Sequence, residues 1–396
     1  MASHLERLPL ELLDLITSYL PALEYCHLRL VSKQLHTNSL RAFIKRYFAT
    51  IRTTLCWPSI CHLAELSTIE CYAKEIKLLD VRIHNWSDRK TMTIARRRGP
   101  EKVGCSDANK FNGSYQDLVE ESQAPEDVDA VETLAQALKG FPNLHAIRIY
   151  THAQYLGLLR CAKRSHYSTE CFMLLLDALV ESKTKLQELS MLDGKDMTSS
   201  TYSSMGKYQA FCLPSPRLPI MHETFVNLRS LSLCIDTTNV SITNAVWENG
   251  ICKFIYAATS LESLSLELDG YRIESPHSSS IISSMAAEGR LARLQRFELA
   301  SSMVDGPSLQ RFLQQHLRTL RCLALVSVNA DDSTWPTTLA FIRDTLEIEQ
   351  LYITTIHFFR PEIRIDSAGR VESPLIKEVL TSAIDQYKKD LKLLGP

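Results

Sequence analysis

The sequence predicts an α/β protein in which a small N-terminal three-helix module precedes an irregular array of alternating strands and helices. Two observations support this prediction. Three apolar runs with helical spacing fill roughly the first fifty residues. From Ile76 onward, one apolar triplet recurs eight times with the same internal spacing, and helix-like stretches lie between its copies.

The composition is typical of a folded intracellular protein. Of the 396 residues, 45% are hydrophobic and 22% charged, and the net charge of -1 favours neither nucleic acid nor a membrane as a partner. The eleven cysteines are odd in number and irregularly spaced, unlike a disulfide framework. Met1–Glu11 lacks the apolar core of a signal peptide, and no uninterrupted apolar stretch is long enough to span a bilayer. We therefore expect a soluble cytoplasmic or nuclear protein.

Residues 1–52 are predicted to form the helical module. Pro9 stands where a helix would begin, and Pro21 ends that first run. The apolar residues of the run are Leu12, Leu13, Ile16 and Leu20. A second cluster comprises Leu28, Leu30 and Val31, and a third run places one helical face on Leu40, Phe43, Ile44, Tyr47, Phe48 and Ile51. Such a short module has little core of its own, so it needs a partner surface or the adjacent domain for stability.

The apolar triplets predict short strands. Their last two members alternate with neighbours and belong on the inward face of a strand, and the first precedes that strand. The copies are Ile76/Leu79/Val81, Leu144/Ile147/Ile149, Leu186/Leu189/Met191, Leu228/Leu231/Leu233, Leu261/Leu264/Leu266, Leu294/Phe297/Leu299, Leu320/Leu323/Leu325 and Ile348/Leu351/Ile353. Helix-like stretches between them are Val131–Leu138, Cys171–Val180, Val246–Ala257, Ser308–Leu317 and Thr337–Leu346. This alternation predicts a leucine-rich-repeat-like solenoid over 131–360, with 53–86 as its first repeat and junction.

Three further segments depart from the alternation. Residues 87–130 carry a basic block followed by an acidic block and few apolar residues, which predicts a disordered charged loop. Residues 195–222 are rich in Ser, Thr and Pro and predict a second long loop. Residues 361–396 are predicted to be a C-terminal cap, with a hairpin near Ile363–Gly369 and a closing helix over Ser373–Leu391.

Two pieces of the N-terminal module together resemble the F-box family. Leu8-Pro9-Leu10-Glu11-Leu12-Leu13 is similar to its Leu-Pro-x-Glu opening, and Leu28–Leu35 is similar to its second signature. The tryptophan that many members carry late in the module is absent, and Phe43 or Phe48 could fill that volume. The resemblance implies docking to the Skp-type adaptor of a cullin–RING ubiquitin ligase. The C-terminal region resembles the degenerate leucine-rich repeats of fungal F-box proteins.

The resemblance assigns adaptor contacts, or support of those contacts, to specific positions. They are Leu8, Pro9, Glu11, Leu12, Ile16, Leu20, Leu30, Val31 and Lys33. Glu11 would make a polar contact or cap its own helix. The same apolar residues could instead form the core of a small bundle, because packing is what apolar stripes usually serve. The sequence leaves core and interface open at each individual position.

Residues that alternate with the triplets could contact a protein partner of the array. These outward positions are His145, Arg148, Tyr150, Arg229, Ser230, Ser232, Arg296, Glu298, Gln350 and Tyr352. At any one of them an ordinary solvated side chain is the simpler interpretation.

No catalytic constellation is evident. Phosphate-binding glycine loops, Cys-x-x-Cys and His-Glu-x-x-His are absent. Cys56, Cys61, His62 and Cys71 lack the spacing of a zinc site, and no third member accompanies His166 with Cys161 or Cys171. We therefore expect no enzyme activity, no metal and no cofactor.

Two functions remain compatible with the sequence. In the first, the chain is the substrate-recognition adaptor of an SCF-type cullin–RING ligase, and the repeats bind a substrate protein that the sequence does not identify. In the second, it is a non-ligase repeat scaffold that uses the F-box for stability or for a different complex. A hydrolase hidden in the irregular repeats is a third and remote alternative.

Overall fold

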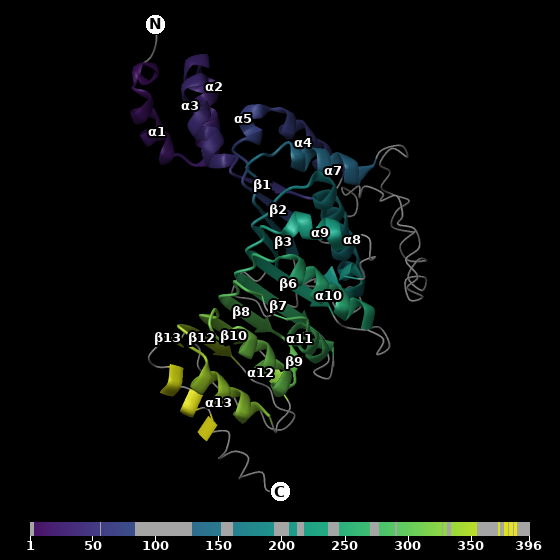
Figure 1. Ribbon diagram of the computed structural model, residues 1–396. Coiled ribbons are helices and arrows are strands. Elements are labelled where there is room, and N and C mark those ends of the chain that lie inside the picture. The colour runs from purple at the N-terminus through teal and green to yellow at the C-terminus, as the bar shows by residue number, and fades with distance from the viewer. Residues whose placement is uncertain are drawn as a thin grey trace.

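The chain folds into a mixed α/β structure with helices at its N-terminus and a parallel sheet in the remainder (Figure 1). The computed structural model describes residues 4–55, 57–83, 129–151, 161–193, 206–211, 218–236, 245–269, 277–289, 291–326, 328–330, 334–354, 371–372, 376–378, 380–382 and 384–385. The predicted charged loop at 87–130 lies almost wholly outside these residues, as do the predicted hairpin at 363–369 and most of the loop at 195–222.

The N-terminal module contains a 3₁₀ turn, η1 (Leu5–Arg7), and the helices α1 (Leu10–Ser18), α2 (Ala22–Val31) and α3 (Lys33–Tyr47). Pro9 and Pro21 directly precede α1 and α2. A proline is tolerated there because the backbone N–H that it lacks would not take part in a helical hydrogen bond. Ser32 caps α3 by accepting a 3.2 Å hydrogen bond from the Leu35 amide.

The predicted helical position of Ile51 is wrong. Helix α3 ends at Tyr47, and Thr50–Thr53 forms β1, the first strand of the sheet, although the sequence predicts a helical module through residue 52. Strand β1 pairs in parallel with β2 (Leu78–Ile83), so that Ile51 lies beside Leu79. Because three of the four residues of β1 are β-branched, pairing with a neighbouring strand outweighs the helical spacing of its one large apolar residue.

Eleven strands of the described part of the chain form one sheet. Its order is β1-β2-β3-β4-β6-β7-β8-β10-β12-β13, and β5 pairs with the end of β6. The remaining members are β3 (Ala146–Thr151), β4 (Glu188–Asp193), β5 (Gly206–Lys207), β6 (Ser230–Asp236), β7 (Ser263–Asp269), β8 (Arg296–Ala300), β10 (Cys322–Val326), β12 (Gln350–Thr354) and β13 (Val371–Glu372). Among the described strands, β13 alone is antiparallel to its neighbour, β12. Short strands β9 (Met303–Val304) and β11 (Asn329–Ala330) form a separate pair.

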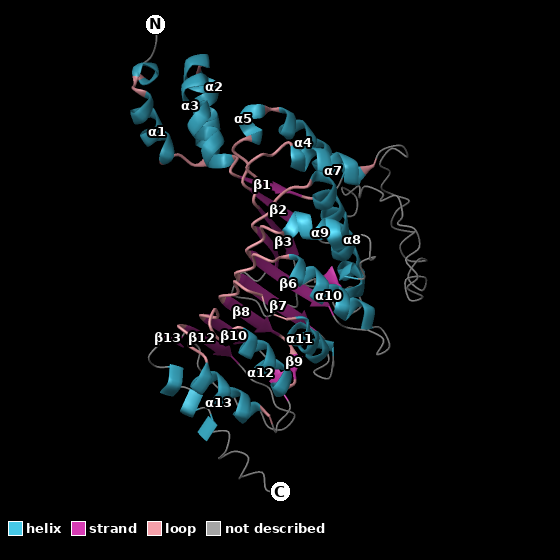
Figure 2. Ribbon diagram, in the orientation of Figure 1, coloured by secondary structure: helices cyan, strands magenta, loops and turns pink. Residues whose placement is uncertain are grey.

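Helices cover one face of this sheet (Figures 1 and 2). They are α4 (Trp57–Thr68), α5 (Glu70–Ala73), α7 (Ala130–Lys139), α8 (Cys161–Ser182), α9 (Leu218–Phe225), α10 (Ala245–Ala257), α11 (His277–Glu288), α12 (Gly306–Gln315) and α13 (Trp335–Thr345). Five of them coincide with the five predicted helical stretches, although α8 begins ten residues earlier than predicted. We call the part of the chain from β1 to β12, which includes α13, the strand–helix array.

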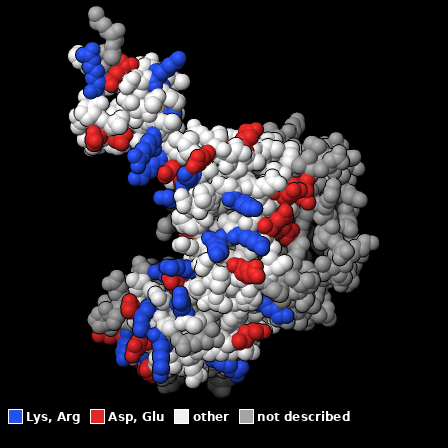
Figure 3. Space-filling view, turned by 45° about the horizontal axis from the view of Figure 1, so that its top comes forward, with Lys and Arg blue, Asp and Glu red and all other residues white. Residues whose placement is uncertain are grey.

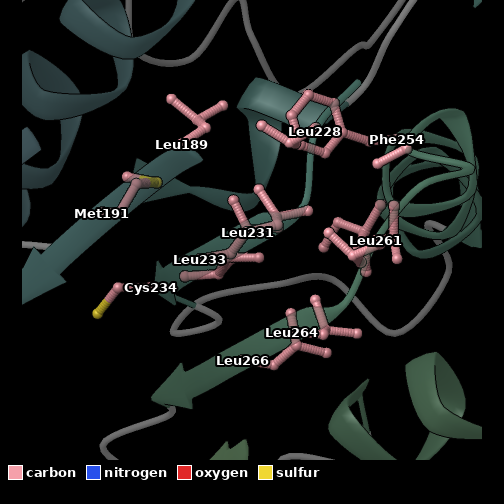
Figure 4. Close-up of a cluster of buried hydrophobic side chains, with 14 of the residues drawn as sticks. Leu189, Met191, Leu228, Leu231, Leu233, Cys234, Phe254, Leu261, Leu264 and Leu266 are labelled. Atoms are coloured by element: carbon pink, nitrogen blue, oxygen red, sulfur yellow. The ribbon is translucent and has the colours of Figure 1, made fainter. Parts of the chain in front are cut away.

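The prediction for the apolar triplets is confirmed. All 24 triplet residues are buried, the last two members lie in the strands, and the first member precedes each strand. Figure 4 shows Leu231, Leu233, Leu264 and Leu266 from neighbouring strands grouped with Phe254 of α10. Equivalent members lie in register, for example Leu231 beside Leu264 and Leu264 beside Phe297. The core is therefore one continuous apolar layer between the sheet and the helices.

The turns before the strands are themselves joined. The Lys77 amide donates to the Ala49 carbonyl, His145 to Lys77, Gln187 to His145 and Arg229 to Gln187, at 2.7–3.1 Å. The series of hydrogen bonds continues in the same way through Glu262, Gln295, Arg321 and Glu349, and we call it the turn ladder. These hydrogen bonds satisfy backbone groups that would otherwise lack partners. They also fix the position of the first triplet member of each copy, just before its strand.

The stretch 195–222 is not loop throughout. Its described residues include β5, a 3₁₀ turn at Tyr208–Phe211 and the start of α9. Phe211 and Met221 are buried in the core, and Phe211 packs 5.8 Å from the ring of Phe172 on α8. These two apolar residues anchor a segment whose polar composition alone predicts a loop.

At the C-terminal end, β13 pairs with Gln350–Leu351 of β12. The described residues between 376 and 385 are helical, as predicted, and bury Ile376, Leu380 and Ile384. Their spacing of four places them on one helical face against the core.

Candidate docking surface

The N-terminal module has a small core of its own. Leu13, Tyr25 and Leu35 are each only 1% exposed, and Ile44 is 4% exposed. These residues come one or two from each helix, so the three helices enclose them jointly. The predicted choice between core and interface is therefore settled for Leu13, which faces the core.

Two buried hydroxyl groups of the module, those of Tyr25 and Ser39, have hydrogen-bond partners. The Tyr25 hydroxyl donates to the Ser39 carbonyl at 3.0 Å, and the Ser39 hydroxyl donates to the Leu35 carbonyl at 2.6 Å. Burial raises the pKa of Tyr25, so this phenol stays protonated and acts as a donor at neutral pH. The Tyr25 ring also packs edge-on against Phe43, with centroids 5.2 Å apart. A hydrogen bond and ring packing thus join α2 to α3.

Helix α1 is fixed through its C-terminal carbonyl groups. The Arg46 guanidinium donates to the Thr17 carbonyl at 2.9 Å, and the Tyr47 hydroxyl donates to the Leu20 carbonyl at 3.2 Å. Both donors come from the last turn of α3. These bonds reach one carbonyl in the last turn of α1 and one just after the helix, and they orient α1 against α3.

A concentration of exposed apolar side chains covers the module. Twelve large hydrophobic residues are exposed among the described residues, and eight of them lie between residues 10 and 31. They are Leu10, Leu12, Leu15, Ile16, Tyr19, Leu23, Leu30 and Val31, which we call the apolar docking face. In Figure 3, wide uncharged areas separate the charged groups of the module, which lies at one end of the molecule. Apolar surface of this extent on one small module marks an interaction site.

Most of the predicted contact residues reach this surface. Leu12 is 47% exposed, Ile16 42%, Leu30 81% and Val31 73%. Pro9, Glu11 and Lys33 are also exposed, whereas Leu8 and Leu20 are half-buried and can support their neighbours. Glu11 lies in the first turn of α1, where its charge is favourable beside the helix dipole.

Four residues of the apolar docking face were not among the predicted contacts: Leu10, Leu15, Tyr19 and Leu23. The family signatures do not include them. A signal was nevertheless present, because the apolar residues of α1 lie on nearly every side of the helix. One side of α1 packs on α3. Because the other sides of α1 are also apolar, this helix needs a second partner.

The face of the sheet opposite the described helices carries polar residues in register. Arg148 lies between Asp80 and Ser190, and it forms hydrogen bonds of 2.6 and 3.3 Å with Glu188. Asp80 lies 3.5 Å from Arg52 and 3.6 Å from Arg82. Seven of the predicted outward residues share this face with them: Arg148, Ser230, Ser232, Arg296, Glu298, Gln350 and Tyr352.

Two of the predicted strand positions lie elsewhere. His145 and Arg229 belong to the turn ladder that precedes the strands, rather than to the strands themselves. Their side chains are therefore at the edge where strands begin, and both residues are exposed.

No group of three or more His, Cys, Asp or Glu residues within the described ranges could hold a metal ion. Cys61 is half-buried and Cys71 exposed, while Cys56 lies outside those ranges. Burial raises the pKa of the Cys61 thiol. Among the described helices, none combines the length and apolar character needed to cross a membrane.

Comparison with known proteins identifies the N-terminal module. Residues 5–40 match the F-box domain family. This segment is an F-box. F-box domains in general bind Skp-type adaptors of SCF ubiquitin ligases. The match spans η1, α1, α2 and the first half of α3, and so includes the entire apolar docking face. No curated protein matches the chain.

Proposed function

We propose that this chain is the substrate-recognition adaptor of an SCF-type cullin–RING ubiquitin ligase. One observation carries the proposal most directly: the F-box holds eight exposed large apolar residues while its own core is formed by others. Removal of several large apolar residues from water at an interface centre supplies most of the affinity of such complexes. The contact residues are those of the apolar docking face, with Leu8, Pro9 and Leu20 in support and Glu11 and Lys33 at its polar rim.

We further infer that the strand–helix array is a degenerate leucine-rich-repeat solenoid of the kind found in fungal F-box proteins, and that it recruits a protein substrate. Support comes from eight buried triplets, parallel strands in nearly chain order and the hydrogen-bonded ladder of turns. Each copy buries its apolar face only against its neighbours, which is the property of a solenoid. In this proposal the chain itself has no catalytic role and acts in the cytoplasm or nucleus.

A structural observation also favours the second candidate, a non-ligase scaffold. The F-box joins the array without a spacer, because α3 ends at Tyr47 and β1 begins at Thr50. The Phe48 ring stacks on Tyr72 of α5, with centroids 4.5 Å apart and an interplanar angle of 19°. Contacts of this kind would let the F-box serve as a stabilising end of the array.

Co-expression of the full chain with a Skp-type adaptor, cullin and RING subunit separates the two candidates. The ligase proposal predicts that all four proteins elute together in gel filtration, and that the double variant Leu8→Ala/Pro9→Ala loses the other three while the array stays folded. Adaptor binding without cullin would favour the scaffold. Unchanged assembly of the double variant would contradict the assigned contacts.

Ile69→Ala is the matched control for this experiment. Ile69 is 43% exposed, close to the 42% of Ile16, but it lies outside the F-box match. Its truncation removes an exposed apolar side chain outside the F-box, so assembly should be unchanged. Equal losses in both variants would indicate general damage to the protein rather than a lost contact.

A further inference from the structure

A pocket of about 530 Å³ opens at the edge of the array where strands begin. Its lining comes from three successive turns and the helix between them. Lys183 and Lys185 precede β4, Val226 precedes β6, and Thr259 precedes β7. Helix α9 contributes Ile220, His222, Glu223 and Thr224.

Apolar exposure is concentrated at this pocket. Only four of the exposed large hydrophobic residues in the described ranges lie outside the F-box, and two of them, Ile220 and Val226, line it. They are 42% and 40% exposed, whereas their neighbours Met221 and Phe225 are buried in the core. Helix α9 and the residue that follows it thus bury some apolar side chains in the core and present others to the pocket.

The charge of the pocket is predominantly basic. Lys183 and Lys185 form no ion pair with any residue that the structure describes, and Glu223 is the single acidic residue of the lining. Lys183 also ends α8 in the left-handed conformation, with φ 55°, where glycine would be the unstrained choice. Two ammonium groups beside exposed apolar side chains complement a ligand that is anionic and apolar at once.

We propose that this pocket is a docking site for an acidic segment of a protein partner that carries a bulky apolar side chain next to its Asp or Glu residues. The proposal rests on the proposed function in taking this partner to be the recruited substrate. The apolar side chain contacts Ile220 and Val226, and the carboxylates lie beside Lys183 and Lys185. Carboxylates fit better than phosphate because Glu223 in the lining repels a doubly charged phosphate more strongly than a singly charged carboxylate.

A degenerate peptide library that includes phosphoserine, applied to the full chain, tests the proposal. The expected result is enrichment of peptides in which Asp or Glu flanks Leu, Ile or Phe. The selected peptide, labelled and measured by fluorescence anisotropy, should bind at least about tenfold more weakly to Lys185→Glu and to Val226→Asp. Its affinity should also fall as salt is raised.

Lys183→Gly is the sharpest variant because it removes one ammonium group while relieving the left-handed backbone. It should weaken peptide binding severalfold and leave the melting temperature unchanged or higher. Lys77→Glu is the matched control, since Lys77 is an exposed lysine of the same turn ladder that does not line the pocket. It should bind the peptide nearly as well as the unchanged chain.

Three outcomes would overturn the assignment: no enriched sequence, preference for phosphoserine over carboxylates, or equal binding by Lys183→Gly, Lys185→Glu and the unchanged chain. Adaptor co-purification of the same variants keeps the two proposals separate. If the peptide binds and the adaptor does not, the ligase function fails while the pocket assignment stands. If the adaptor binds and no peptide is enriched, the pocket assignment fails alone.

Discussion

The F-box and the strand–helix array use the same residue types in opposite ways. Leu12, Ile16 and Leu30 of the F-box are 42–81% exposed, whereas Leu231, Leu264 and Leu323 of the array are at most 1% exposed. All six occupy regularly spaced positions of helices or strands. The comparison teaches that periodicity identifies the elements, but exposure shows whether an apolar residue serves the fold or a partner.

The difference has a geometric origin. Each strand that carries a triplet has neighbouring strands on both sides and helices over one face, so its triplet finds apolar partners within the chain. In the F-box, three helices enclose only a few residues, and the rest of their apolar surface has no partner within the described chain. The following predictions test this contrast, beginning with the largest effect on stability.

Truncation of an array leucine should cost far more stability than truncation of an exposed F-box leucine. Leu231→Ala leaves a cavity between β6 and α10 and should lower the free energy of unfolding by about 2–5 kcal/mol. Leu30→Ala, at 81% exposure, should change it by less than about 0.5 kcal/mol. Urea unfolding followed by circular dichroism measures both, and comparable losses would contradict the contrast.

The junction between the two regions should contribute an intermediate amount. Phe48→Ala removes the stack on Tyr72 and a half-buried ring, which should cost about 2 kcal/mol. Hydrogen exchange should then rise in α1–α3 more than in the array, because the F-box loses its contact with α5. Uniform exchange throughout the chain would show that the ring only supports the array core.

The cap of α3 should have a smaller effect. Ser32→Ala removes the acceptor for the Leu35 amide and should destabilise the F-box by about 1 kcal/mol. Ser32→Asp retains an acceptor at the same place and should recover most of that loss. A thermal melt of both variants is sufficient, and an unchanged melt for Ser32→Ala would mean that the 3.2 Å bond contributes no stability.

The smallest expected effect depends on pH. Burial, followed by repulsion from Asp129, Glu132 and Asp177, raises the pKa of Glu181. The folded state therefore binds this proton more tightly than the unfolded state, so ionised Glu181 disfavours folding at neutral pH. Glu181→Gln should be more stable at pH 7 by less than about 1 kcal/mol, since solvent screens an exposed group.

The advantage of Glu181→Gln should shrink as pH falls through the raised pKa, and it should vanish below about pH 4, where the glutamate is protonated in both states. Unfolding curves at pH 7 and pH 4 measure this. A constant difference between the two proteins at both pH values would exclude ionisation of Glu181 as the cause.

Much of the array could be predicted from sequence because its signal is local. The spacing within Leu228/Leu231/Leu233 defines one inward strand face, and the structure buries all three at 1% exposure. Strand β1 escaped prediction because its partner, β2, lies about 25 residues away and contributes nothing to local periodicity. The buried Phe211 was hidden by its Ser- and Pro-rich surroundings.

The exposed apolar residues of the F-box were only partly predictable. The signatures identified Leu12, Ile16, Leu30 and Val31, and all four are exposed. They could not separate Leu12 from Leu13, which are adjacent in sequence but 47% and 1% exposed. That separation depends on how the three helices pack, and one helix alone does not determine it.

The affinity of the full chain for a purified Skp-type adaptor, measured by isothermal titration calorimetry, tests the central claim most directly. We predict that Leu12→Ala/Ile16→Ala weakens binding at least about thirtyfold, corresponding to about 2 kcal/mol. Ile69→Ala should bind like the unchanged chain. The melting temperatures of all three proteins should agree within a few degrees. Equal affinity of the double variant and Ile69→Ala would contradict the assignment of the exposed F-box residues to adaptor docking.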